Sequence, residues 1–261
     1  MSELILPEPA AAPTADPHQA VTASPHALWG FWATCAWGIG AIAAIAVAEV
    51  GAAVALVEWW IATGKSVPNE LAAQPTALSA AAFAILPACV AVIWLAARVL
   101  RVSVADYLAL RRVDAANLLI GLGCTIAYLA VVNVVAHVTG RGPAVPFVGE
   151  IHRTVLESGT LPLLLLAILV ALPVTQELLF RGFLLRGWAA SRLGAIGAVA
   201  LSSALWACMP ANHDWIVAGQ IFGLGLLFGY LRIRSGSTVT TILLHAVYSA
   251  GALIQAAILA G

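Results

Sequence analysis

Long apolar segments alternate with short polar connections along most of this chain. A membrane-spanning helix needs about 20 predominantly apolar residues. Seven segments approach or exceed this length, near residues 33–61, 77–98, 115–138, 160–181, 194–211, 215–232 and 238–259. The pattern predicts an all-α polytopic membrane helix bundle of about seven spans, and six to eight spans are compatible with it.

The composition agrees with a membrane class. The 261 residues are 62% hydrophobic and 9% charged, and the mean hydropathy is +0.99. Soluble domains carry about 25% charged residues, so we expect the surface of this chain to face a lipid bilayer. The formal net charge is zero, which offers no electrostatic basis for binding nucleic acid. We therefore expect no nucleic-acid partner.

Residues 1–28 differ in composition from the rest of the chain. They are rich in Ala, Pro, Ser and Thr and contain no Lys or Arg. Such a segment cannot bury an apolar core and is typical of disorder. A signal peptide would need a basic region before its apolar run, so we expect the first apolar segment to remain as a membrane helix. We interpret residues 1–28 as a disordered tail and 29–158 as N-terminal membrane helices.

Basic residues fall unequally on the two sides of a seven-span arrangement. Three lie on one side, namely Lys65, Arg141 and Arg153. Nine lie on the other, namely Arg98, Arg101, Arg111, Arg112, Arg181, Arg186, Arg192, Arg232 and Arg234. Cytoplasmic loops carry an excess of Lys and Arg. The asymmetry predicts an integral protein of the cytoplasmic (inner) membrane, with the N-terminal tail and the Arg181 end in the cytoplasm.

Polar and ionisable side chains interrupt the later apolar segments. Glu177 and Arg181 have the spacing at which an acid and a base pair on one helix face. His245 is followed one turn later by Ser249, and His213 lies in the connection before the sixth segment. Ionisable groups inside a membrane mark functional sites by default. We therefore expect these groups, which come from separate helices, to converge on one site.

Glycines recur in the sixth segment at spacings of four residues, namely Gly219 with Gly223 and Gly225 with Gly229. In lipid, where apolar surfaces gain little by associating, small residues let helix backbones approach closely. We interpret these glycines as positions of close helix packing. They carry no chemistry of their own.

Three ordered stretches in the last hundred residues resemble a known family. They are LPVTQELLFRGFLLRG (172–187), LSSALWACMP (201–210) and GLLFGYLRIRSGSTVTTILLHAVYSAGAL (225–253). Together they resemble the CPBP family of intramembrane CAAX-prenyl-protease and bacteriocin-processing-type (Abi) proteins. The resemblance defines a CPBP-like helical core over residues 159–261. It implies a conical cavity open to the cytoplasmic side and to lipid.

The family motifs are EExxxR, FxxxH and HxxxN or HxxxB. The resemblance places Gln176 at the first Glu, while Glu177 and Arg181 match the second Glu and the Arg. Trp206 falls at the Phe of the second motif, where Pro210 replaces the His. His245 matches the third motif, and Ser249 replaces the usual Asn.

These replacements leave two functions open. Within the family, the first Glu and the second-motif His are understood to activate water for peptide hydrolysis, often with a metal. An active endopeptidase would place Glu177, His213 and His245 in the chemistry, with Arg181 orienting Glu177. The same three residues would then bind a divalent, zinc-like metal, and the substrate would be a membrane-associated or lipidated peptide.

The alternative is a catalytically inactive pseudoprotease that binds a membrane protein partner and needs no metal. Gln is a neutral amide and Pro has no side-chain ligand, so neither Gln176 nor Pro210 can serve as an anionic base or hold a cation. A transporter is a third class, but the two halves of the chain show no internal repeat of the kind that transporters often contain.

Overall fold

The structure is a computed structural model that describes residues 28–71, 74–140, 160–209 and 214–260. Every regular element within these ranges is a helix. The predicted disordered tail, apart from Leu28, lies outside the described residues, as do Pro210 and His213.

Six helices in the described part of the chain are long and apolar enough to cross a membrane. They are α2 (Phe31–Ala62), α3 (Pro75–Val99), α5 (Ala115–Val138), a helix over Leu161–Ala189, α11 (Trp215–Ser235) and α12 (Thr238–Ala260). The predicted all-α polytopic bundle is confirmed. The predicted span 194–211 is instead the 14-residue α10 (Gly194–Ala207), whose length of about 21 Å is less than the roughly 30 Å of a hydrocarbon core.

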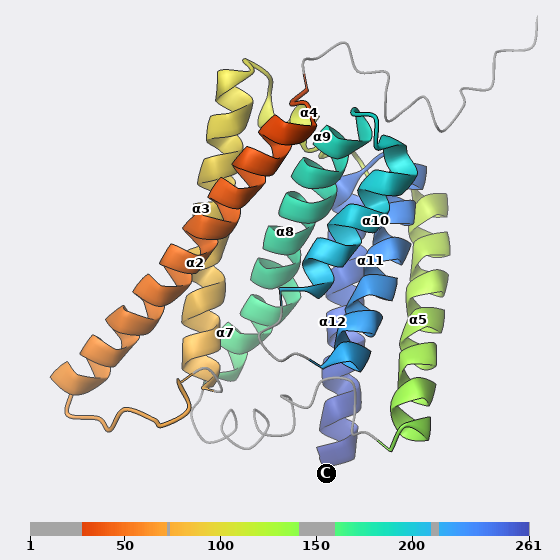
Figure 1. Ribbon diagram of the computed structural model, residues 1–261. Coiled ribbons are helices and arrows are strands. Elements are labelled where there is room, and N and C mark those ends of the chain that lie inside the picture. The colour runs from red at the N-terminus through yellow and green to blue at the C-terminus, as the bar shows by residue number, and fades with distance from the viewer. Residues whose placement is uncertain (1–27, 72–73, 141–159, 210–213, 261) are drawn as a thin grey trace, which may run out of the picture.

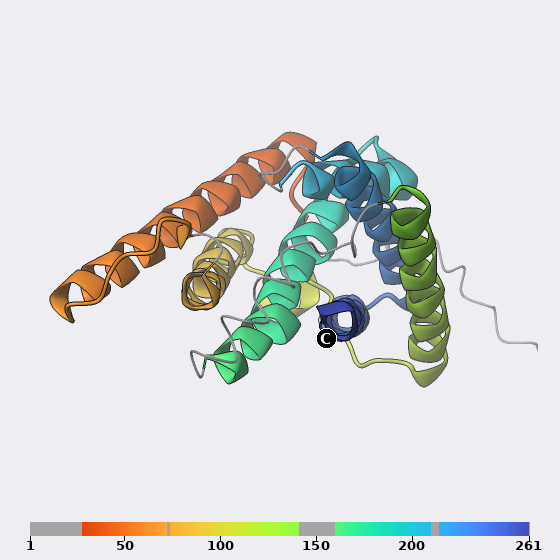
Figure 2. The ribbon, with the colours of Figure 1, turned by 90° about the horizontal axis from the view of Figure 1, so that it is seen from below.

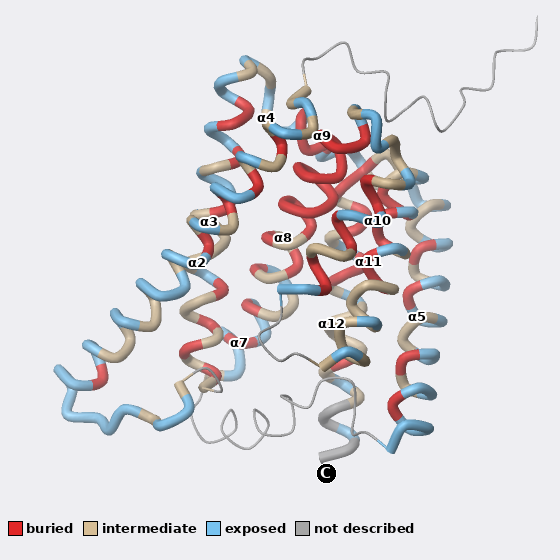
Figure 3. The backbone as a smooth tube through the Cα atoms, viewed as in Figure 1, coloured by how far each residue is buried: buried red, intermediate tan, exposed pale blue. Residues whose placement is uncertain are grey.

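The helix over Leu161–Ala189 is the central element of the bundle. Half of its most apolar 18-residue stretch is buried inside the protein, against 11% for α2. Its α-helical parts, α7 (Leu161–Leu166), α8 (Leu172–Glu177) and α9 (Leu185–Ala189), are joined by π-helical turns over Ala167–Ala171 and Leu178–Leu184. Figure 3 shows buried residues concentrated along α8, α9 and the neighbouring α10 and α11. This helix therefore supplies packing surface for α2, α3, α10, α11 and α12.

The remaining long helices lie on two sides of the central helix (Figure 1). The view from below shows α2 and α3 extending together to one side (Figure 2). In the same view α12 lies between the central helix and α5. Residues far apart in sequence on the central helix, α10, α11 and α12 are thereby brought together.

Local chemistry sets several helix boundaries. The side chains of Ser103, Asp114 and Asp214 accept backbone N–H bonds at the N-termini of α4 (Val104–Tyr107), α5 and α11, the usual role of an N-cap. Pro75 opens α3, where its missing N–H costs no helical bond. Gly236 ends α11 with φ 65°, a conformation that glycine adopts without strain.

The helix ends that carry most of the arginines gather at one end of the bundle. Arg186 on α9 donates to the backbone carbonyls of Asp106 and Tyr107 at the end of α4. Thr238, the first residue of α12, donates to the carbonyl of Leu108 at 2.5 Å. This clustering agrees with the predicted arginine asymmetry. The cytoplasmic orientation stays a prediction from the sequence.

Glycines permit the close approach of α11 to its neighbours. A Cβ at Gly225 would lie 2.7 Å from Cβ of Ser203, and one at Gly229 would lie 2.6 Å from a methyl of Val199, both on α10. A Cβ at Gly223 would meet the Tyr128 hydroxyl of α5 at 2.5 Å. Close packing is therefore confirmed at these three glycines. A Cβ at Gly219 would meet no described residue within 4 Å, so the prediction was wrong there for the described part of the chain.

Candidate functional site

A buried ion pair lies on the central helix. Nη1 of Arg181 donates to Oε1 of Glu177 at 3.0 Å, and both side chains are 0% exposed. Glu177 ends α8 and Arg181 lies in the π-helical turn that follows. The ion pair expected from the spacing of the two residues is thus present. Pairing lowers the cost of holding each charge out of water.

His245 brings α12 into contact with this pair. Its Nδ1 lies 3.0 Å from the same carboxylate oxygen of Glu177. Because an ionised carboxylate only accepts hydrogen bonds, the proton of this bond belongs to Nδ1 of His245. Ser249, one turn further along α12, is half-buried and makes no hydrogen bond to the described residues.

Trp206 of α10 joins three of the predicted motif positions. Its ring lies 4.3 Å from the guanidinium carbon of Arg181 and 5.3 Å from the ring of His245, in an edge-on arrangement. Its Nε1 donates to Oε1 of Gln176 at 3.2 Å. Gln176 is thereby bound to α10. Unlike His245 and Arg181, the side chain of Gln176 makes no hydrogen bond to Glu177. Trp206 was known from the sequence only as the counterpart of the motif's Phe.

α11 forms another wall of the site. The ring of Phe228 lies 5.5 Å from that of His245, and Nη2 of Arg181 donates to the Gly225 carbonyl at 3.5 Å. Phe228 is fully buried. No signal in the sequence singles it out, because one apolar residue in an apolar helix looks like its neighbours.

Two buried polar atoms of this cluster are left without a hydrogen bond in the described part of the chain. Oε2 of Glu177 and Nε of Arg181 are buried and have no hydrogen-bond partner among the described residues. Buried polar atoms normally find a partner, and exceptions deserve an explanation. Oε2 of Glu177 is therefore an available acceptor inside the protein. A carboxylate that orients an imidazole, with a second acceptor to spare, has the composition of an acid–base site.

The predicted metal ligands are only partly described, so the metal site stays a prediction. Of the predicted ligands Glu177, His213 and His245, the structure brings Glu177 and His245 together, and His213 lies outside the described residues. No group of three or more His, Cys, Asp or Glu side chains that could hold a metal occurs in the described ranges. The Glu177 oxygen that contacts His245 also binds the guanidinium of Arg181, whose positive charge opposes a metal cation at the same place.

Two cavities among the described residues lie away from this cluster. One of about 480 Å³ is lined by the start of α10 and the end of α11. The other, of about 230 Å³, is lined by residues of α2 and α3 that include Glu49, and by Leu71. Neither has Glu177 or His245 in its lining. The conical cavity implied by the family resemblance stays a prediction.

Comparison with known proteins supports the family of the C-terminal part. Residues 158–251 match the family described as "Type II CAAX prenyl endopeptidase Rce1-like". Comparisons with curated proteins and with solved structures gave no match. The matched segment contains Gln176, Glu177, Arg181, Trp206 and His245, so every contact of the polar cluster lies within it. The match over residues 158–251 of this integral membrane protein therefore supports the resemblance of this part of the chain to the CPBP family of CAAX-protease-like proteins.

Proposed function

We propose that this protein is a catalytically inactive, CAAX-protease-like binding protein whose site holds a membrane peptide or a segment of a membrane protein partner. One observation carries the proposal. Gln176, at the position of the family's water-activating Glu, is a neutral amide bound to Trp206, while one oxygen of the neighbouring Glu177 binds both Arg181 and His245.

Peptide hydrolysis needs a group that takes a proton from water or holds a cation that polarises it. Gln176 does neither, and its oxygen is occupied by the Trp206 N–H. Oε1 of Glu177 already accepts from a guanidinium and an imidazole. These contacts join α8 to α10 and to α12, so positions that are catalytic in the family hold the helices together in this proposal.

An active endopeptidase is the second candidate, and the free acceptors of the cluster favour it. Nε2 of His245 makes no hydrogen bond to the described residues, and Oε2 of Glu177 is likewise without a partner there. In this alternative Glu177 orients His245 through Nδ1. Nε2 of His245 then takes the proton from a water molecule that attacks the peptide carbonyl, and passes it to the amide nitrogen, which leaves as the amine when the C–N bond breaks.

A peptide assay in liposomes separates the two functions. The purified chain is reconstituted with a membrane-anchored peptide that carries a fluorophore and a quencher on either side of the expected cleavage region. The proposal expects saturable binding of intact peptide and no cleavage above that of the Glu177→Ala variant. Cleavage by the native chain that is lost in both Glu177→Ala and His245→Ala, at a temperature at which both variants are still folded, would establish the endopeptidase. Absence of both binding and cleavage would contradict both functions.

A further inference from the structure

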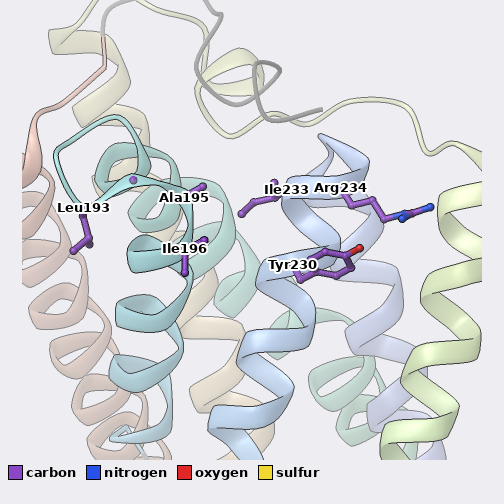
Figure 4. A pocket seen from close by; sticks show the side chains of 7 residues that line it. Leu193, Ala195, Ile196, Tyr230, Ile233 and Arg234 are labelled. Atoms are coloured by element: carbon purple, nitrogen blue, oxygen red, sulfur yellow. The ribbon is translucent and has the colours of Figure 1, made fainter. Parts of the chain in front are cut away.

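The larger of the two cavities is an open groove where α10 begins and α11 ends, and we refer to it as the α10–α11 groove. It is lined by Leu193–Ile196 on one side and by Tyr230, Ile233 and Arg234 on the other, and its volume is about 480 Å³. Figure 4 shows the side chain of Ala195 facing that of Ile233 across it. Volumes of this size are typical of small-molecule sites.

The groove has a cause in the packing of the two helices. Gly225 and Gly229 let α11 approach Ser203 and Val199 of α10 so closely that a side chain at either glycine position would not fit. The next residue in this four-residue series is Ile233, whose side chain lines the groove. A branched side chain at this position keeps the two helices apart. The helices therefore diverge toward the arginine-bearing end of the bundle.

The lining changes in character along the groove. Its floor and one wall consist of aliphatic side chains, and Ile196 is 86% exposed at its edge. Tyr230 and Arg234 line the other wall. Figure 4 shows the Tyr230 hydroxyl and the Arg234 guanidinium on the same side of α11, directed away from α10. An apolar slot with a cation and a hydroxyl beside it matches one acyl chain and the phosphate of a lipid.

Charge at this end of the bundle favours an anionic lipid. The segments 98–114, 186–193 and 232–238 contain eight arginines and two aspartates. Arg186 is bound by backbone carbonyls, and Arg232 donates to the Thr238 hydroxyl at 2.8 Å. Arg234 is exposed, and its one bond to the described residues runs from Nε to Oδ1 of Asn117 at 3.3 Å. Its two terminal nitrogens are therefore available to an external phosphate.

We propose that the α10–α11 groove is a binding site for an anionic phospholipid, with one acyl chain between α10 and α11 and the phosphate at Arg234 and Tyr230. Basic pockets between membrane helices are suited to anionic head groups, and each arginine near the surface contributes about 1 kcal/mol. Tyrosine is favoured at the same depth because its ring is apolar and its hydroxyl is polar. The site is separate from the Glu177 cluster and independent of the proposed function.

Native mass spectrometry of the full chain tests this site. The delipidated protein is mixed with equal amounts of phosphatidylglycerol and phosphatidylcholine that carry identical acyl chains. We expect about a fivefold preference for phosphatidylglycerol, the ratio that corresponds to about 1 kcal/mol. Arg234→Gln should bring the preference close to parity, and Arg234→Lys should retain most of it. Ala195→Phe, which fills the groove, should reduce the binding of both lipids.

Arg192→Gln is the matched control, because Arg192 is an exposed arginine beside the groove that does not line it. It should keep the preference. Equal binding of the two lipids by the native chain would overturn the proposal, and so would an equal loss in Arg192→Gln and Arg234→Gln, which would indicate general surface charge. In a separate arm, the melting temperature of the protein is measured with soluble glycerol phosphate and with the lipid. If glycerol phosphate raised the melting temperature as much as the lipid does, the acyl chain would have no role and the proposal would fail.

Discussion

The indole N–H of Trp206 donates to the side-chain oxygen of Gln176 across 3.2 Å, and this bond links the second family motif to the first. The same ring covers the guanidinium of Arg181 at 4.3 Å. Trp206, which aligns with the apolar Phe of the motif, thus makes two polar contacts, a hydrogen bond and a cation–π contact. The site must be understood as a network in which Gln176, Arg181 and Trp206 depend on one another.

Trp206→Phe should remove the hydrogen bond to Gln176 and keep a ring over Arg181. We expect a loss of about 1 kcal/mol in the free energy of unfolding, the usual contribution of one hydrogen bond. Trp206→Ala should cost about 3–5 kcal/mol, because it also removes a large buried ring. Denaturation in detergent micelles measures both. Trp32→Ala is the control, since Trp32 is 81% exposed; a loss there as large as in Trp206→Ala would contradict the explanation.

Glu177→Ala should be strongly destabilising, because it leaves the guanidinium of Arg181 buried without its carboxylate. Breaking a buried ion pair from one side typically costs about 3–5 kcal/mol. The double variant Glu177→Ala with Arg181→Met should be more stable than Glu177→Ala alone, since no unpaired charge remains. The same denaturation assay applied to a double-mutant cycle measures the coupling. Additive losses would show that the two side chains do not stabilise one another.

Gly225→Ala should push α11 away from α10, because the new methyl would lie 2.7 Å from Cβ and 3.0 Å from Cα of Ser203. Backbone contacts of this kind cannot relax by rotating a side chain, so we expect a loss of about 1–3 kcal/mol. Gly219→Ala on the same helix provides the comparison. An added methyl at Gly219 would have no described residue within 4 Å, and this replacement should be neutral or stabilising by up to about 1 kcal/mol. Equal effects at the two positions would contradict the packing argument.

Restoring the family residues should restore an affinity for metal. The double substitution Gln176→Glu with Pro210→His supplies the carboxylate and imidazole that the native sequence lacks. We expect elemental analysis to find about one zinc ion for each purified chain, since carboxylate and imidazole are favoured zinc ligands. The control is Gln176→Glu with Pro210→Ala, which adds the charge without the second ligand. An equal amount of zinc in the native chain would refute the idea that these two replacements removed a metal site.

Contacts that are local in sequence were the predictable ones. The apolar segments predicted the membrane helices, since length and composition alone decide whether a helix can cross a bilayer. The four-residue spacing predicted the ion pair of Glu177 and Arg181. The order of the spans predicted that most arginines lie on one side, and the structure brings the helix ends that carry them together at one end of the bundle. These features follow from the geometry of one helix or from the order of the spans.

Tertiary structure decided the rest. The bonds from His245 to Glu177 and from Trp206 to Gln176 join residues 68 and 30 positions apart, and they depend on where the helices cross. The two π-helical turns, the short α10 and the α10–α11 groove depend on helix packing in the same way. In a membrane the lipid-facing and protein-facing sides of a helix are both apolar, so the hydrophobic pattern that orients a helix in a soluble protein is weak. The sequence by itself therefore determined which segments enter the membrane and which polar residues they carry, and only the packing of the helices decided which of those residues meet.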